Sequence, residues 1–209
     1  MASSKKVVRK RLAKNIKTSL KILIICEGPT EGTYIEDLLG DIPNIEIVSI
    51  DGAGYGKFKN YIESNEKLYK VFLVVADLDK AQPDSQTRKT SNGYHLLNGL
   101  ITYLHKLNNQ NTIFLSNPDI EYWIACLIGQ ESYTEADLVS IGYRKGDSVN
   151  AFLRAHNGNF DTAVVLANSD KVYYRKPKPG VNYTLQRDYL ELRQSNLTEL
   201  LVYIQMLNQ

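Results

Sequence analysis

The chain has 209 residues, of which 43% are hydrophobic and 23% charged, and its formal net charge is +2. This composition is ordinary for a globular protein with one full core, and no stretch approaches the length of apolar chain that crosses a bilayer. The N-terminus lacks the apolar run of a signal peptide, and the 2 cysteines are too few for a disulfide framework or a convincing zinc site. We therefore expect a cytoplasmic protein that does not bind membranes.

The start of the chain is strongly basic. Residues 1–21 hold eight lysines and arginines and no acid, so the rest of the chain carries a net charge of −6. A basic arm over residues 1–19 in front of an acidic body suits contact with a phosphate backbone. A solvated tail has the same composition, and charge alone leaves both interpretations open.

The chain then alternates between predicted strands and helices. Residues 20–26 form a short apolar run ended by Gly28 and Pro29, which indicates a buried strand. Thr30 can cap a helix that begins near Glu31. The following predicted elements are a strand over 45–50, an amphipathic helix over 57–69, a buried strand over 71–76, a loop over 80–92, a helix over 93–107, a strand over 112–115 and a helix over 120–128.

Four alternations of strand and helix predict an α/β core over residues 20–130, with a mainly parallel four-stranded sheet flanked by helices. The pattern changes after about residue 130. The remaining chain has helical candidates at 147–155, 160–169 and 197–207. We predict that residues 131–209 are a helical extension packed on the core.

Acidic residues follow two of the predicted strands. Glu27 comes directly after the first strand, and Asp77 and Asp79 come directly after the third. Ligands of open parallel sheets gather at the carboxyl ends of the strands, and residues two apart in extended chain project to the same side. Asp77 and Asp79 could then share an ion, and carboxylate oxygens suit Mg²⁺ or Mn²⁺. A turn-capping role for the Asp-x-Asp pair is the plainer alternative.

A strand that ends in Glu-Gly, followed by a later strand that ends in Asp-x-Asp, resembles the pattern of Toprim domains, which occur in topoisomerases, primases and overcoming-lysogenization-defect nucleases. More narrowly, the chain resembles the RloB-like Toprim proteins associated with bacterial defence loci. Three blocks carry the resemblance, together with Tyr143 and Lys145: CEGPTE at 26–31, ADLD at 76–79 and SNPDIEYW at 116–123. Between these blocks the likeness is not specific.

The resemblance implies a Toprim-like Rossmannoid core and a metal-dependent nuclease. Asp77 and Asp79 would hold Mg²⁺ or Mn²⁺, and Glu27 would act as a general acid or base or as a further ligand. Glu31 would reach the same ions, Glu121 would complete a second metal position, and Lys145 would stabilise charge on the phosphate. Each of these last three has a plain alternative: a surface carboxylate, a helix N-terminal acid and an ordinary loop cation. The number of metal ions stays open.

A second basic segment lies near the C-terminus. Residues 171–187 interleave cations with tyrosines, a combination that neutralises phosphates and stacks single-stranded bases. Its candidate nucleic-acid contacts are Lys171, Tyr173, Tyr174, Arg175, Lys176 and Lys178. A proline-rich surface loop would look the same.

The function that these features favour is a Mg²⁺- or Mn²⁺-dependent nuclease acting on DNA or RNA, tRNA included. The resemblance alone implies a role in anti-phage defence. The chain lacks the ATPase region of the overcoming-lysogenization-defect nucleases, so an ATP requirement would need a partner protein such as an ATPase encoded nearby. The first alternative is a Toprim module that binds nucleic acid or a partner protein without turnover. A more distant alternative is a hydrolase or transferase of a small nucleotide, and an Asp-x-Asp glycosyltransferase is more distant still because it leaves Glu27 unexplained.

Overall fold

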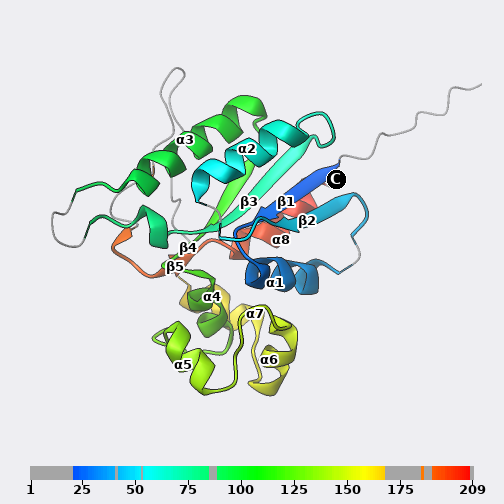
Figure 1. Cartoon of the computed structure of the whole chain (residues 1–209). Coiled ribbons are helices and arrows are strands. Elements are labelled where there is room, and N and C mark those ends of the chain that lie inside the picture. The colour runs from blue at the N-terminus through cyan, green and yellow to red at the C-terminus, as the bar shows by residue number, and fades with distance from the viewer. Residues whose placement is uncertain are drawn as a thin grey trace, which may run out of the picture.

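A computed structural model describes residues 21–40, 42–52, 54–84, 89–167, 185 and 190–207. At its centre is a five-stranded sheet in the order β2-β1-β3-β4-β5 (Figure 1). The strands are β1 (Ile22–Cys26), β2 (Ile45–Ser49), β3 (Val71–Asp77), β4 (Thr112–Asn117) and β5 (Gln194–Ser195). The first four are parallel and β5 is antiparallel to β4. The α/β class and the mainly parallel sheet predicted from the sequence are confirmed.

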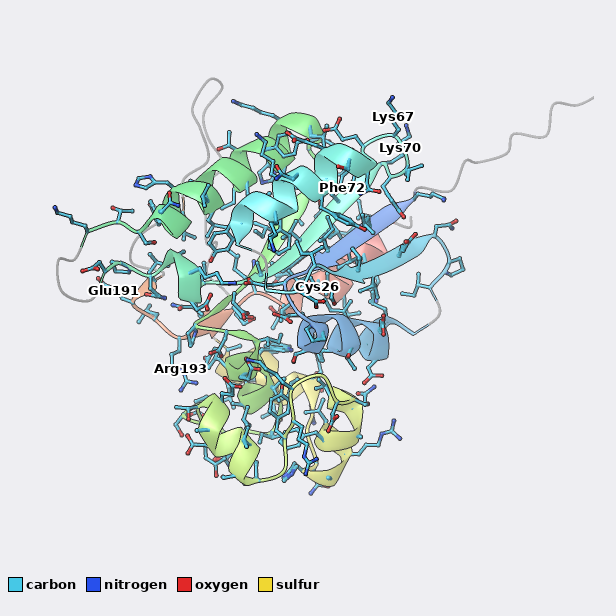
Figure 2. All side chains as sticks on the ribbon, in the orientation of Figure 1. Cys26, Lys67, Lys70, Phe72, Glu191 and Arg193 are labelled. Atoms are coloured by element: carbon cyan, nitrogen blue, oxygen red, sulfur yellow. The ribbon has the colours of Figure 1, made fainter. Side chains whose placement is uncertain are left out.

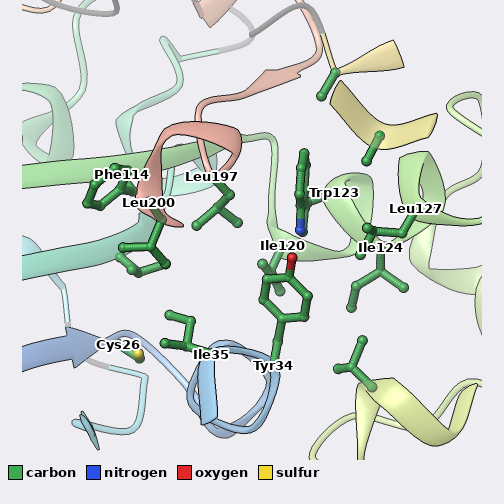
Figure 3. Packing of buried hydrophobic residues seen from close by; sticks show 14 of the residues in the cluster. Cys26, Tyr34, Ile35, Phe114, Ile120, Trp123, Ile124, Leu127, Leu197 and Leu200 are labelled. Atoms are coloured by element: carbon green, nitrogen blue, oxygen red, sulfur yellow. The ribbon is translucent and has the colours of Figure 1, made fainter. Parts of the chain in front are cut away.

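Helices cover both faces of the sheet because its parallel strands are apolar on both sides. In β1, Ile22, Ile24 and Cys26 belong to one core cluster, and the intervening residues belong to the other. Helices α1 (Pro29–Leu39), α4 (Ile120–Leu127) and α8 (Thr198–Leu207) pack in the first cluster, and α2 (Tyr55–Asn65) and α3 (Asn92–Leu107) pack in the second. Figure 3 shows α1 and α4 meeting in the first cluster, where Tyr34 points at the fully buried Trp123.

Short helices gather beside α1 beyond the end of β4 (Figure 1). After α4 they are α5 (Glu135–Ser140), α6 (Val149–Ala155) and α7 (Phe160–Leu166). Asp37 of α1 fastens this group, because its carboxylate accepts hydrogen bonds from the Ser148 hydroxyl at 2.9 Å and the Asn150 backbone N–H at 3.2 Å. Helix α5 was not predicted, although Thr134 and Asp137 form its capping box.

The C-terminal residues return to the sheet. Strand β5 pairs with the end of β4, and α8 places Leu200 and Ile204 in the core. The Phe114 and Tyr203 rings lie 6.2 Å apart at this junction. The predicted division between a core and an extension near residue 130 stays a prediction. The predicted four-stranded sheet is corrected to five strands, because the C-terminal part of the chain adds β5 beside β4.

The chain after β3 differs from the extended segment that the sequence suggested. Leu78 turns out of the strand with φ −94° and ψ 0°, and residues Asp79–Ala81 form a short 3₁₀ helix, η1. Leu78 is fully buried, and its N–H bonds to the Ser116 and Pro118 carbonyls at 2.8 and 3.0 Å. Asp77 and Asp79 are therefore not two residues of one extended segment that project to the same side. The chain turns between them, at the buried Leu78.

The strand order places a topological switch point between β1 and β3, since the chain proceeds from β1 to β2 on one side and from β3 to β4 on the other. Open α/β sheets bind ligands at such a point, outside the carboxyl ends of the strands. Glu27 and Asp77 stand at this edge. Among the described residues, no helix combines the length and hydropathy that a membrane crossing requires.

Candidate functional site

Glu27 and Asp77 lie side by side at the switch point. The Glu27 backbone N–H bonds to the Val75 carbonyl at 3.2 Å, which keeps Glu27 against β3 after β1 has ended. Its carboxylate oxygen Oε2 lies 3.4 Å from the backbone N of Asp77. Glu27 is only 6% exposed. Burial raises the pKa of its carboxyl, while the ion pair with Lys80 opposes the increase.

Glu31 comes to the same place from the first turn of α1. Gly28 is the N-cap of this helix and Pro29 opens it, so Glu31 occupies the third helical position and its side chain turns back toward Gly28. Glu31 is buried, and this burial raises the pKa of its carboxyl to about 7. The Glu121 and Glu27 carboxylates raise the pKa further, against the backbone N–H groups of Glu31 and Gly28. It is not the surface carboxylate that the sequence left open.

Glu121 enters from the first turn of α4 and is 1% exposed. Its Oε1 accepts a hydrogen bond from the Tyr143 hydroxyl at 3.3 Å and lies 3.3 Å from the Lys145 ammonium nitrogen. Thr30 of α1 joins this network, because its hydroxyl oxygen lies 3.5 Å from the Tyr143 hydroxyl and accepts a bond from the Gly146 N–H at 3.3 Å. Burial raises the pKa of Glu121, and the positive charge of Lys145 opposes that increase.

These acids act on one another electrostatically. The pKa of Asp77 lies well above its usual range, first because the carboxyl is desolvated and then because Glu31, Glu27, Glu121 and Asp119 add negative charge. Burial also raises the pKa of Asp119, the N-cap of α4. We call Glu27, Glu31, Asp77, Asp119 and Glu121 the carboxylate cluster. Its members lie at the carboxyl ends of β1 and β3 and at the starts of α1 and α4, so only the folded chain assembles it.

Two lysines face the carboxylate cluster. Lys80, directly after Asp79 in η1, pairs with Glu27. Lys145 lies 3.3 Å from both Glu121 and the partly exposed Glu135, and its own side chain is 57% exposed. Burial lowers the pKa of each ammonium, but the neighbouring carboxylates raise it above its ordinary value overall. Sequence reasoning found Lys145 and missed Lys80, for which the only available signal was its place beside Asp79.

Asp79 lies at the exposed start of η1, and its Oδ1 accepts a hydrogen bond from the Lys80 backbone N–H at 2.6 Å. Its charge raises the pKa of Glu27 and of Lys80, which places it at the solvent side of the carboxylate cluster. Figure 2 shows Cys26 at the carboxyl edge of the sheet where this site lies, and Lys67 and Lys70 at the opposite edge. Asp79 is therefore near the buried acids without being packed among them.

The donor chemistry of the carboxylate cluster fits a hard divalent cation, because its side chains supply carboxylate oxygens alone. In the described part of the chain, however, no three His, Cys, Asp or Glu side chains converge closely enough to hold a metal ion. Mg²⁺ commonly takes one or two protein carboxylates and completes its shell with water and substrate phosphates. The five acids of the carboxylate cluster pair with two ammonium groups, Lys80 at Glu27 and Lys145 at Glu121.

The six candidate nucleic-acid contacts between Lys171 and Lys178 lie outside the described residues, as does the basic arm over residues 1–19. No protein-family model matches the chain, and no curated protein or solved structure is significantly similar to it.

Proposed function

We propose that the chain is a Mg²⁺- or Mn²⁺-dependent phosphodiesterase of nucleic acids, built on a Toprim-like fold. The observation that carries this proposal is the carboxylate cluster at the switch point, where Glu27 lies against Asp77 and the side chains of Glu31 and Glu121 are buried. Concentrated negative charge of this kind calls for a cation, and a cation at a sheet edge in turn recruits phosphate. Glu27 and Asp77, the acids that the sequence singled out after β1 and at the end of β3, supply part of this negative charge.

Asp77 would hold the metal with Glu27, Glu31 or Glu121, and Asp79 would contribute from the solvent side. A bound ion would supply an activated water and positive charge for the phosphodiester. The chain itself would supply two ammonium groups, Lys80 and Lys145, for charge that develops on the phosphate oxygens. Glu27, adjacent to Asp77 and paired with Lys80, would exchange protons with the reacting groups or act as a further ligand.

The resemblance to RloB-like proteins adds the wider setting of the proposal. It suggests a role in bacterial anti-phage defence and a partner protein, such as an ATPase, that activates cleavage. DNA and RNA are both open as substrates, and tRNA is one candidate. The basic segments outside the described residues would contact the nucleic acid.

Cleavage of labelled single-stranded DNA, single-stranded RNA and tRNA tests the proposal. The assay compares the wild type with Asp77→Asn and Glu27→Gln in Mg²⁺, in Mn²⁺ and in a chelator. We expect metal-dependent cutting by the wild type and a loss of at least about a hundredfold in each variant, as is typical when an electrostatic catalytic group is removed. Asp161→Asn, an exposed acid of α7, is the matched control and should cut normally.

Folding of each variant is checked by thermal denaturation. If well-folded Asp77→Asn cuts as fast as the wild type, the carboxylate cluster is not the catalytic site. If the wild type binds nucleic acid tightly but cuts none of the three substrates, with or without metal, the non-catalytic binding module becomes the better interpretation.

A further inference from the structure

A pocket of about 560 Å³ opens at the end of η1, where Ala81 is part of its lining. Gln82 and Pro83 line it directly after η1, Tyr94 lines it from the start of α3, and Leu190 and Glu191 line it from the C-terminal segment. Figure 2 shows Glu191 on this side of the molecule. The volume lies within the range of about 300–1,000 Å³ that is typical of small-ligand sites. Neither the metal chemistry nor the sequence motifs use these residues.

The apolar lining suits a flat ring. Tyr94 is 7% exposed, and its hydroxyl donates a hydrogen bond of 2.6 Å to the Leu185 carbonyl, which fixes the ring from its far end. Pro83 and Leu190 add two compact apolar surfaces. Aromatic and apolar side chains of this kind hold unstacked nucleobases in sites for single-stranded nucleic acid.

The described part of the polar lining favours an uncharged occupant. Among the described residues, the pocket has one carboxylate, Glu191, and no lysine or arginine. Gln82 donates one side-chain N–H to the Asn117 Oδ1 at 2.8 Å, which orients its amide group. Its carbonyl oxygen and second N–H have no partner in the described part of the chain. A side-chain amide with these two groups is the standard partner of the amino group and N7 of adenine.

The pocket is linked to the acidic edge of the sheet through η1, which begins at Asp79 and ends at Ala81 in the pocket lining. Gln82 lies three residues after Asp79, and its partner Asn117 is the last residue of β4, the strand paired with β3. One nucleotide could therefore reach the acidic edge with its phosphate and this pocket with its base. We propose that the pocket binds a nucleobase of the substrate, adenine before the others, and so sets which nucleotide stands at the scissile phosphate. This inference rests on the proposed function for its biological meaning.

The test uses the full chain in a chelator, with adenosine, uridine and ribose as probes, and follows backbone amide resonances in NMR titrations. We expect adenosine to shift the resonances of Gln82, Tyr94 and Leu190, uridine to bind more weakly, and ribose to leave them unchanged. Gln82→Leu should weaken adenosine binding by about tenfold, the effect of losing one base-edge contact pair. Thr90→Trp, which fills the pocket, should abolish it. Gln110→Leu, an exposed glutamine before β4, is the matched control.

The inference is overturned if adenosine at its solubility limit shifts none of these resonances, or if Gln82→Leu and Thr90→Trp, both folded, bind adenosine like the wild type. Because a chelator is present, this result does not depend on metal or cleavage. Adenosine binding without any nuclease activity would support the pocket while removing the proposed function. Cleavage without adenosine binding would support the proposed function and overturn the assignment of the pocket to a nucleobase.

Discussion

Replacing Glu31 by glutamine should change how stability depends on pH. Glutamine has the shape of the glutamate and can keep the hydrogen bond to the Gly28 N–H, but it carries no charge. In the folded chain the pKa of Glu31 rises from 4.5 to about 7. Burial is the main cause, and the Glu121 and Glu27 carboxylates add to it. The folded protein therefore holds the Glu31 proton more tightly than the unfolded chain does.

The sign follows from this difference. An acid with a raised folded pKa contributes stability that is fully present below about pH 4.5 and is lost as the pH rises through about 7. A rise of this size makes the free energy of unfolding about 3 kcal/mol lower at high pH than at low pH. Between about pH 5 and about pH 8, the unfolding free energy of Glu31→Gln should therefore gain about 2–3 kcal/mol relative to the wild type.

Urea denaturation in a chelator measures this difference. The fluorescence of Trp123, the one tryptophan of the chain, reports unfolding because the indole is fully buried. Glu36→Gln, an exposed acid on the same helix, is the control and should follow the wild type at both pH values. Equal pH dependence of Glu31→Gln and the wild type would refute the view that Glu31 is buried against other carboxylates.

Two further predictions concern the supports of the site. Gly93→Ala should destabilise the fold by about 1–3 kcal/mol and lower cleavage, because its Cβ would lie 1.9 Å from the Lys80 carbonyl oxygen and push η1 away. Gly99→Ala on the same helix has open space and should stabilise by up to about 1 kcal/mol, and equal melting curves for the two would contradict this packing. Lys145→Met should lower the free energy of unfolding by roughly 1 kcal/mol. The loss is small because the lysine side chain is largely exposed, and water weakens its attraction to Glu121. In a double-mutant cycle, Lys145→Met should cost much less stability when Glu121→Gln is already present. Strict additivity of the two substitutions would show that Lys145 and Glu121 do not interact.

The parts of the fold with short-range causes could be predicted from the sequence. The apolar runs of β1 and β3 are buried on both faces, and parallel strands bring their carboxyl ends to one edge, so Glu27 and Asp77 could be placed together in advance. The helix after β1 was predicted, but its start was placed two residues late: Thr30 is not the cap, because Gly28 is the N-cap and Pro29 opens α1.

The remaining features depend on contacts between distant residues. Strand β5 has two residues and exists because β4 pairs with it. Asp79 leaves the strand direction because Leu78 is buried under the Ser116 and Pro118 carbonyls, which no local pattern reveals. The surroundings of Glu31 likewise come from distant parts of the chain. Glu121 of α4 acts on its carboxyl, and Tyr143 contacts the neighbouring Thr30 from 113 positions away. The ion pair of Lys80 with Glu27 likewise joins residues 53 positions apart.

The central claim is that the carboxylate cluster binds a divalent cation, and titration with Mn²⁺ followed by electron paramagnetic resonance tests it directly. We predict saturable Mn²⁺ binding by the wild type, competition by Mg²⁺, and a loss of at least about tenfold in affinity for folded Asp77→Asn, because removing one ligand carboxylate weakens a hard-cation site. Asp161→Asn should bind like the wild type. Equal Mn²⁺ affinity for the wild type and Asp77→Asn, or no saturable binding by either, would contradict the account.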